Sequence, residues 1–120
     1  GVVVSTPEMN QAIRTRAARR EVLDAFLDTG FAWERADGMV HVLRSNEYKR
    51  AGTGKSRDRD ALIVISENND RWTLYEGLIE ANHYSRRTLD PIRAIFAEAR
   101  VATLESGQKY EGAGGEAAVK

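Results

Sequence analysis

Apolar residues recur with helical spacing between residues 7 and 29. The tripeptide Thr6-Pro7-Glu8 is typical of a helix start, with a hydroxyl cap, a proline in the first turn and an acid at the positive end of the dipole. Gly30 is a natural end. A helix over residues 7–29 is therefore predicted. At about 100° per residue its apolar side chains share one side: Met9, Ile13, Leu23 and Leu27.

In two later regions apolar and polar residues alternate, as is typical of β-hairpins. Residues 31–35 and 39–43 flank Asp37-Gly38, a strong short-range hairpin signal. Residues 61–66 and 71–75 flank Asn68-Asn69-Asp70 and predict a second hairpin. The run from Ala61 to Ile65 is apolar on both faces, which places that strand in the middle of a covered sheet. The polar, glycine-containing residues 44–60 between the hairpins predict a long loop.

A closing helix is predicted from Asp90-Pro91 to about residue 106, before Gly107. It carries two apolar stripes on nearly opposite sides. The larger is the expected core stripe: Ile92, Ile95, Phe96, Ala99 and Ala102. The smaller is the expected outer ridge: Ala97, Val101 and Leu104. Residues 77–87 predict only a helical turn and a loop, and residues 108–120 have no pattern.

These elements predict an α+β fold, in which an antiparallel four-stranded sheet of two hairpins is covered by an N-terminal and a C-terminal helix. Residues 1–107 form the expected single domain and residues 108–120 the expected flexible tail. This arrangement is shared by many unrelated proteins, so function has to be argued from particular residues.

Composition narrows the classes of function. The 120 residues include no cysteine, which excludes disulfides, thiolate metal sites and a cysteine nucleophile. The longest apolar run has five residues, far short of the ~18 of a membrane span, and the first residues lack the features of a signal peptide. A cytoplasmic protein with no membrane partner is therefore expected. Eighteen basic and 18 acidic residues balance, so net charge favours neither nucleic acid nor an acidic surface.

The sequence predicts no catalytic residue, no metal site and no cofactor. Gly52-Thr53-Gly54-Lys55-Ser56 resembles the end of a phosphate-binding loop, but Lys49 stands where the motif requires its first glycine. Glu80 and His83 have the spacing of two metal ligands on a helix, yet no second such pair follows. A non-catalytic binding or regulatory protein, of bacterial or phage type, is the favoured interpretation.

Nucleic acid is the first expected partner. Arginines occupy the middle of the apolar side of the first helix, where unpaired burial would be costly, so either they extend past the core edge or they form a basic surface. The loop at residues 44–60 offers further cations and a tyrosine for base stacking. The expected contact residues are Arg16, Arg19, Arg20, Tyr48, Lys49, Arg50, Lys55, Arg57 and Arg59. Acidic neighbours such as Asp58 and Asp60 leave open that these charges are merely solvated.

A protein partner or a homodimer is the alternative. A helix that is apolar on two sides is either enclosed in its own domain or covered by a partner. The ridge formed by Ala97, Val101 and Leu104 is the expected contact surface of such an inhibitor or adaptor.

Overall fold

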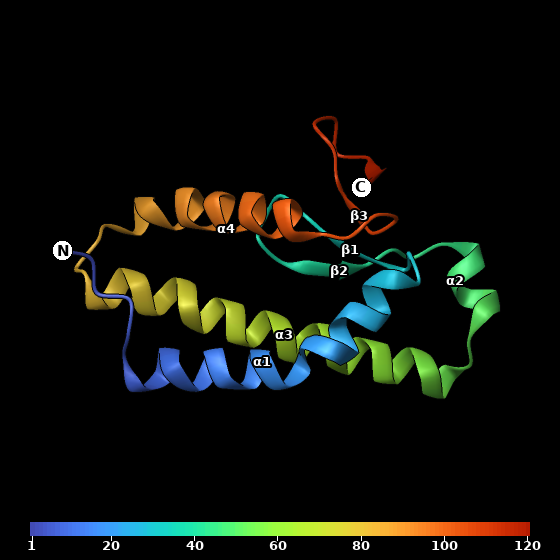
Figure 1. Cartoon of the computed structure of the whole chain (residues 1–120), viewed down its shortest axis with the longest axis horizontal. Coiled ribbons are helices and arrows are strands. Elements are labelled where there is room, and N and C mark those ends of the chain that lie inside the picture. Colours follow the sequence, from blue (N-terminus) through green and yellow to red (C-terminus); the bar gives the residue numbers. More distant parts are fainter.

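The computed structural model describes residues 1–120 and is α+β, with four α-helices, a short 3-10 helix and a four-stranded sheet. Figure 1 shows α1 and α3 side by side, α4 on the other side of the small sheet, and α2 at one end of the molecule. The elements in chain order are α1 (Pro7–Asp28), β1 (Ala32–Glu34), β2 (Val40–Val42), α2 (Asn46–Ala51), α3 (Gly54–Ala81), η1 (Arg86–Thr88), α4 (Leu89–Thr103), β3 (Lys109–Glu111) and β4 (Ala117–Val119).

The predicted first helix and first hairpin are confirmed. The Thr6 hydroxyl caps α1 by accepting from the backbone N–H of Met9 at 3.1 Å. Gly30, with φ +76°, turns the chain into β1. Strands β1 and β2 pair antiparallel around Asp37-Gly38. Gly38 also has φ +76°, and an added Cβ would lie 2.8 Å from the Tyr75 hydroxyl oxygen, so a larger residue does not fit there.

The second predicted hairpin is wrong, because residues 54–81 form one continuous helix of 28 residues, α3. Ile63 and Val64 pack against the core, whereas Leu62 and Ile65 are exposed. The expected turn residues instead use their side chains in tertiary contacts. Asn68, in particular, accepts from the N–H of Val40 at 3.0 Å and donates to the carbonyl of Val40 at 2.8 Å.

The predicted long loop at residues 44–60 is also wrong, since it contains α2 and the first two turns of α3. The turn between them is held by a capping box, in which the Thr53 and Ser56 side chains each accept from the other residue's backbone N–H. Such reciprocal caps satisfy donors that a helix start leaves unpaired. The phosphate-loop-like segment Gly52–Ser56 is therefore a turn and a helix start that follow a helix rather than a strand.

The sheet is mixed rather than purely antiparallel. Its strand order is β2-β1-β3-β4, with β1 and β3 parallel and the two hairpins antiparallel. The second hairpin, β3–β4, lies in residues 109–119, within the segment predicted as an unpatterned tail. Lys109 and Tyr110 pair with Trp33 and Glu34 of β1, so regular structure continues almost to the C-terminus.

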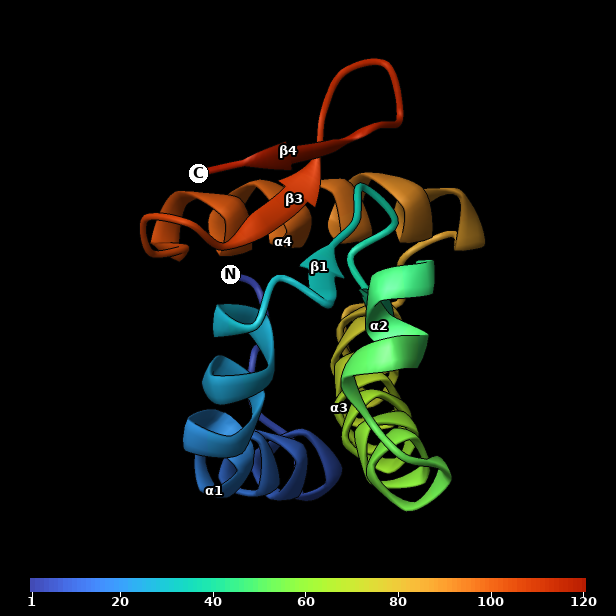
Figure 2. The same cartoon turned by 90° about the vertical axis from the view of Figure 1, so that its right-hand side faces the viewer.

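The predicted closing helix is confirmed with changed bounds, but its apolar residues do not divide into a core stripe and an outer ridge as expected. Ile92 and Phe96 of the expected core stripe are half-buried. Ala97 and Leu104 are buried and Val101 packs against the core, so the expected outer ridge faces inward. Ile95 of the expected core stripe is 67% exposed. Figure 2 shows α4 crossing the molecule behind β3, with α1 and α3 below it.

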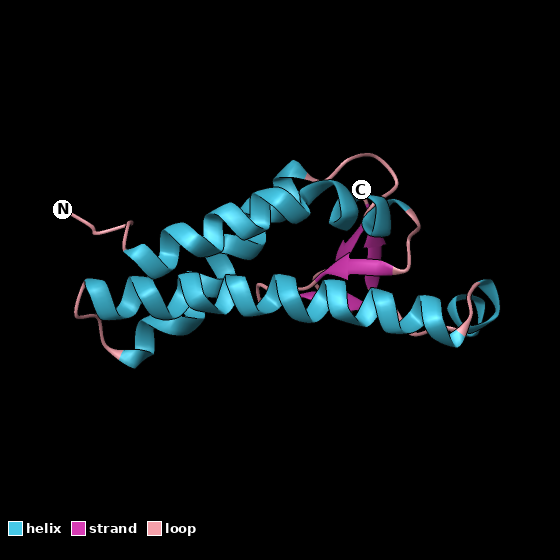
Figure 3. Cartoon of the chain, turned by 90° about the horizontal axis from the view of Figure 1, so that it is seen from below, coloured by secondary structure: helices cyan, strands magenta, loops and turns pink.

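The main core lies where the C-terminal half of α1 meets the first hairpin and α3. Its seven buried residues are Leu23, Phe26, Leu27, Ala32, Val40, Tyr48 and Leu104. Figure 3 shows the strands gathered beside α3, between the end that carries α2 and the opposite end, where the N-terminus lies. None of the helices combines the length and the apolar character that crossing a membrane requires.

Candidate functional site

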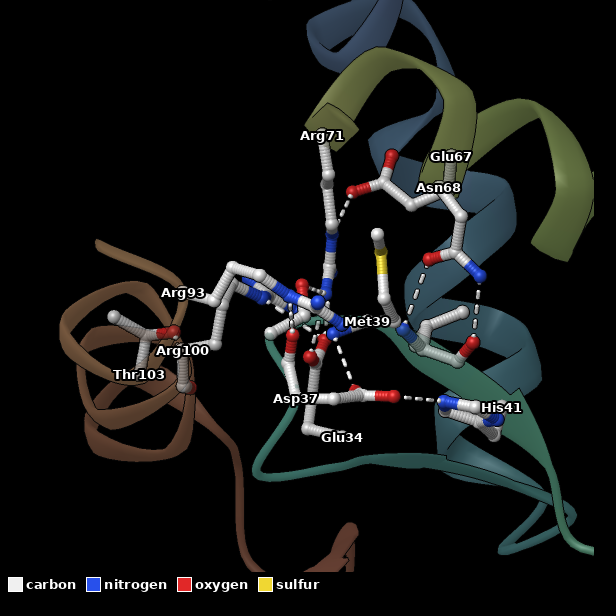
Figure 4. Close-up of polar contacts among 12 residues, drawn as sticks. Glu34, Asp37, Met39, His41, Glu67, Asn68, Arg71, Arg93, Arg100 and Thr103 are labelled. Carbon is white, nitrogen blue, oxygen red and sulfur yellow. Dashed lines mark hydrogen bonds and ion pairs between the residues drawn. The ribbon is translucent and has the colours of Figure 1, made fainter. Parts of the chain in front are cut away.

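Arg71 of α3 lies at the centre of a set of buried ion pairs. Its side chain and that of Glu34 on β1 are both 0% exposed. Two parallel hydrogen bonds join them, from Nη1 to Oε1 and from Nη2 to Oε2, each 2.7 Å long. Arg71 Nε donates to Oε2 of Glu67, one turn earlier in α3, at 2.7 Å. Figure 4 shows Arg71 reaching from α3 to Glu34 on the hairpin. Every guanidinium nitrogen of Arg71 is therefore committed within the protein.

Two arginines of α1 join the same carboxylates. Arg16 Nε donates to Oε2 of Glu67 at 3.0 Å. Arg19 donates to Oε1 of Glu67 and to Oδ2 of Asp70, both at 2.9 Å. These two arginines of the predicted nucleic-acid surface are thus largely buried against α3, and ion pairs resolve the problem of charge on the apolar side of α1.

Arg100 of α4 completes the arrangement by donating from Nε to Oε2 of Glu34 at 3.0 Å. Between the helices, the Phe96 ring lies 5.1 Å from the guanidinium carbon of Arg16 and 5.1 Å from that of Arg71. We call this set the buried network; it ties α1, β1, α3 and α4 together. Its members are Arg16, Arg19, Glu34, Glu67, Asp70, Arg71 and Arg100.

Glu67 and Arg71 supply fixed charge rather than protons. Burial alone would raise the pKa of the Glu67 carboxyl, but Arg71 and Arg16 outweigh it and hold that pKa below its usual range. Burial would lower the pKa of Arg71, and Glu34 and Glu67 more than offset it, so the pKa of Arg71 is raised. A general acid or base works best with a pKa near the working pH. Neither Glu67 nor Arg71 has one.

The β1–β2 turn is fastened to α3 and α4 beside the buried network. The Tyr75 hydroxyl donates to the carbonyl of Gly38, and Arg93 Nε donates to the carbonyl of Asp37 at 2.6 Å. The Asp37 carboxylate lies 2.8 Å from Nε2 of His41. Burial would raise the pKa of Asp37, but the hydrogen bonds and charge of its neighbours, His41 foremost, lower it. These contacts fix the turn rather than form an open site.

Tyr48 does not stand free for stacking on a base. It is buried in the core, its ring centre 5.4 Å from that of Phe31. Its hydroxyl donates to Asp60 at 2.8 Å, and burial together with Asp60 raises the pKa of Tyr48 to about 12. Tyr48 therefore anchors α2 against the start of α3.

The predicted contact residues of the segment 44–60, apart from Tyr48, gather at one end of the molecule. Arg57 Nη1 donates to the carbonyls of Lys49 and Gly52 at 3.0 and 3.2 Å, which binds the end of α2 to α3. None of the cations in this region forms an ion pair within the chain. All but Arg57 are exposed. We call this set the basic end: Arg44, Lys49, Arg50, Lys55, Arg57 and Arg59.

Arg20 stands apart from the basic end. Its side chain is 75% exposed, and its one ion pair, with Asp24, is long at 3.8 Å. The structure thus divides the predicted nucleic-acid residues into paired arginines of α1, one nearly free arginine of α1, a buried tyrosine and a basic end on α2 and α3.

The predicted protein-contact ridge is enclosed by the chain itself, since Ala97 and Leu104 are buried. An apolar groove lies instead between α1, α3 and α4, with a volume of about 490 Å³. All 12 residues that line it are hydrophobic. They include the exposed Ile13 and Ile95 and, from the N-terminal segment, Val2 and Val4. Asn82 holds this segment by bonding both the N–H and the carbonyl of Val3.

The central residues of the buried network were missed by the sequence analysis. A signal for them exists in the sequence, because Glu67, Arg71, Tyr75 and Ile79 follow one another at intervals of four and are all buried in α3. That spacing marks one helix side. It was obscured by the interpretation of residues 61–75 as strands, whose period is two.

Comparisons of the chain with protein-family models, with curated proteins and with solved structures find no match. No group of three or more His, Asp or Glu side chains is arranged to hold a metal ion.

Proposed function

We propose that this protein binds nucleic acid without catalysis, by contacts between the basic end and the phosphate backbone. The observation that carries the proposal is the set of cations at the basic end that no carboxylate of the chain neutralises. In contrast, Arg71, Arg16 and Arg19 each meet a carboxylate within 3.0 Å.

The local structure supports a phosphate contact at this end. Arg50 lies on the last turn of α2 and Lys55 on the first turn of α3, on either side of the turn that Arg57 fastens. The N-terminus of a long helix such as α3 also carries partial positive charge, which favours a nearby phosphate. Glu47, Asp58 and Asp60 lie in the same region, and the six cations exceed these three carboxylates.

Fluorescence anisotropy with labelled single- and double-stranded DNA and RNA tests the proposal. The triple variant Lys49→Ala/Arg50→Ala/Lys55→Ala removes exposed cations whose side chains form no ion pair in the structure, so it should fold normally. Each lost phosphate contact should reduce the slope of log affinity against log salt by about 0.7–0.9.

A matched control removes three cations elsewhere. Arg14, Arg87 and Lys109 lie outside the basic end and form no ion pair, so their alanine variant should keep the affinity apart from a small effect of net charge. Equal losses in the two variants, or no binding by the parent protein at about 50 mM salt, would refute the proposal.

A protein partner is the second candidate, favoured by the apolar groove between α1, α3 and α4. Contiguous exposed apolar surface marks interaction sites more often than chance. Ile13→Glu and Ile95→Glu each place a charge in the exposed lining of the groove. Each should abolish binding of such a partner, at low and at high salt alike. Binding that persists in both variants would exclude the groove.

A further inference from the structure

We propose that Arg16, Arg20 and Arg100 form a binding site for a phosphate-type oxyanion between α1 and α4. These three side chains line a cavity of about 210 Å³, and Glu67 and Asp24 are among its other lining residues. The site is distinct from the basic end: Glu67 lies 12 residues along α3 from Lys55, or about 18 Å at the rise of an α-helix.

The cavity is lined by hydrogen-bond donors that no group of the protein accepts. Arg71 uses all three of its guanidinium nitrogens within the protein, and Arg19 uses two. Arg16 and Arg100, in contrast, each donate only from Nε. Their four Nη groups have no acceptor in the chain. Because a guanidinium presents its donors as a rigid planar fork, these groups suit the oxygens of a phosphate.

The carboxylates of the buried network are already engaged by other donors. Oε2 of Glu34 accepts from Arg71 and from Arg100, and Oε2 of Glu67 accepts from Arg71 and Arg16. The remaining oxygens of Glu34 and Glu67 accept from Arg71 and Arg19. The Nη groups of Arg16 and Arg100, which bond neither carboxylate, are open to an acceptor from outside the protein.

The site also carries excess positive charge. The buried network holds four arginines and three carboxylates, so it carries one positive charge in excess. Arg20 and Asp24, which line the same cavity, add one charge of each sign. Excess positive charge in a partly desolvated site attracts an anion more strongly than the same charge on an open surface. Phe96 holds Arg16 in place by a cation–π contact at 5.1 Å.

Two sources supply the same oxyanion chemistry: free phosphate or a phosphate monoester, and a backbone phosphate of nucleic acid. Isothermal titration calorimetry with inorganic phosphate, at ionic strength held constant with chloride, tests the first. Anisotropy with a labelled oligonucleotide tests the second. Nitrogen-15 NMR of the arginine Nε–H groups locates the site, since Arg16 and Arg100 should shift and Arg14 should not.

Arg20→Ala is the principal variant, because Arg20 is exposed and its loss leaves the buried network intact. It should weaken binding roughly tenfold, the effect of losing one hydrogen bond to a charged group. Arg14→Ala removes the same charge from α1 outside the cavity and should leave binding unchanged. Arg100→Lys keeps the charge but not the planar fork, and should also weaken binding.

Saturable phosphate binding that Arg20→Ala weakens and Arg14→Ala spares would support the site with free phosphate as its ligand. Oligonucleotide binding with the same dependence on Arg20, and no binding of phosphate itself, would support the site and assign the oxyanion to the nucleic-acid backbone. The inference is overturned if the binding of neither ligand depends on Arg20, or if Arg20→Ala and Arg14→Ala lose affinity equally. The nucleic-acid proposal fails separately, by the variants of the basic end.

Discussion

Replacing Arg71 with methionine tests whether the buried network stabilises the fold. Methionine has a similar length and fills much of the same space, so the change chiefly removes charge and hydrogen bonds. Arg71 makes three hydrogen bonds of 2.7 Å to Glu34 and Glu67, and each bond to a charged partner contributes about 1.5–3 kcal/mol. Adding the three bonds gives an upper bound on the loss of stability, because Arg16, Arg19 and Arg100 continue to neutralise the two carboxylates.

We expect a loss of about 3–5 kcal/mol in the free energy of unfolding, as for other buried pairs that lose one partner. That is a large share of the about 5–15 kcal/mol by which a domain is usually stable. Urea unfolding followed by the fluorescence of Trp33 and Trp72 and by circular dichroism measures it. With a slope of about 1–3 kcal/mol per M, the midpoint should fall by about 1 M or more.

A second variant separates the ion pair from general damage to packing. In a double-mutant cycle of Arg71→Met with Glu34→Gln, the combined loss should be smaller than the sum of the single losses by about 0.5–3 kcal/mol. Arg87→Met, at an exposed position without an ion pair, is the control and should leave the midpoint unchanged. A loss below about 1 kcal/mol for Arg71→Met, in the range of ordinary substitutions, would refute the reasoning.

Three further outcomes are expected. Leu104→Ala should lower the free energy of unfolding by about 2–5 kcal/mol, whereas Ile95→Ala should hardly change it. Equal losses in urea melts would contradict the burial of Leu104 and the exposure of Ile95. In the folded protein the pKa of Glu67 is depressed below its usual 4.5. Its contribution to stability is therefore complete above pH 4.5 and is lost as the pH falls through the folded pKa. Urea midpoints that stay constant from neutrality to about pH 3 would contradict this. Spectrophotometric titration should show the pKa of Tyr48 at about 12 in the parent protein and a lower value in Asp60→Asn, because a nearby carboxylate opposes ionisation of the phenol.

Local signals predicted the parts of the fold that local chemistry decides. The Thr6 cap, Gly30 and Asp37-Gly38 act within a few residues of themselves, and the helix and hairpin they mark were found as expected. The run from Ala61 to Ile65 failed because β-branched residues favour strands only weakly, and packing against α1 overrides that preference. Asn68, typical of a turn, is satisfied in a helix because its amide bonds Val40 across the core.

The candidate sites were predictable only in part, because some of their contacts join residues that are far apart in the sequence. The sequence indicates that arginines such as Arg16 and Arg19 cannot lie unpaired in a dry core. Their partners, Glu67 and Asp70, lie about 50 residues later in the sequence. The sequence predicts a hairpin there instead of a helix, so it does not indicate the pairing. The unpaired cations of the basic end needed no such partner, and they were found directly in the sequence.

The side-chain amide of Asn68 has a consequence for how this sheet meets other molecules. By bonding both backbone groups of Val40, it occupies hydrogen-bonding positions that an incoming strand would need beside β2. Exposed sheet edges are templates for unwanted pairing between chains, and natural proteins block them in various ways. Here one residue of a helix blocks part of one border of the sheet, and β4 (Ala117–Val119) forms the other border.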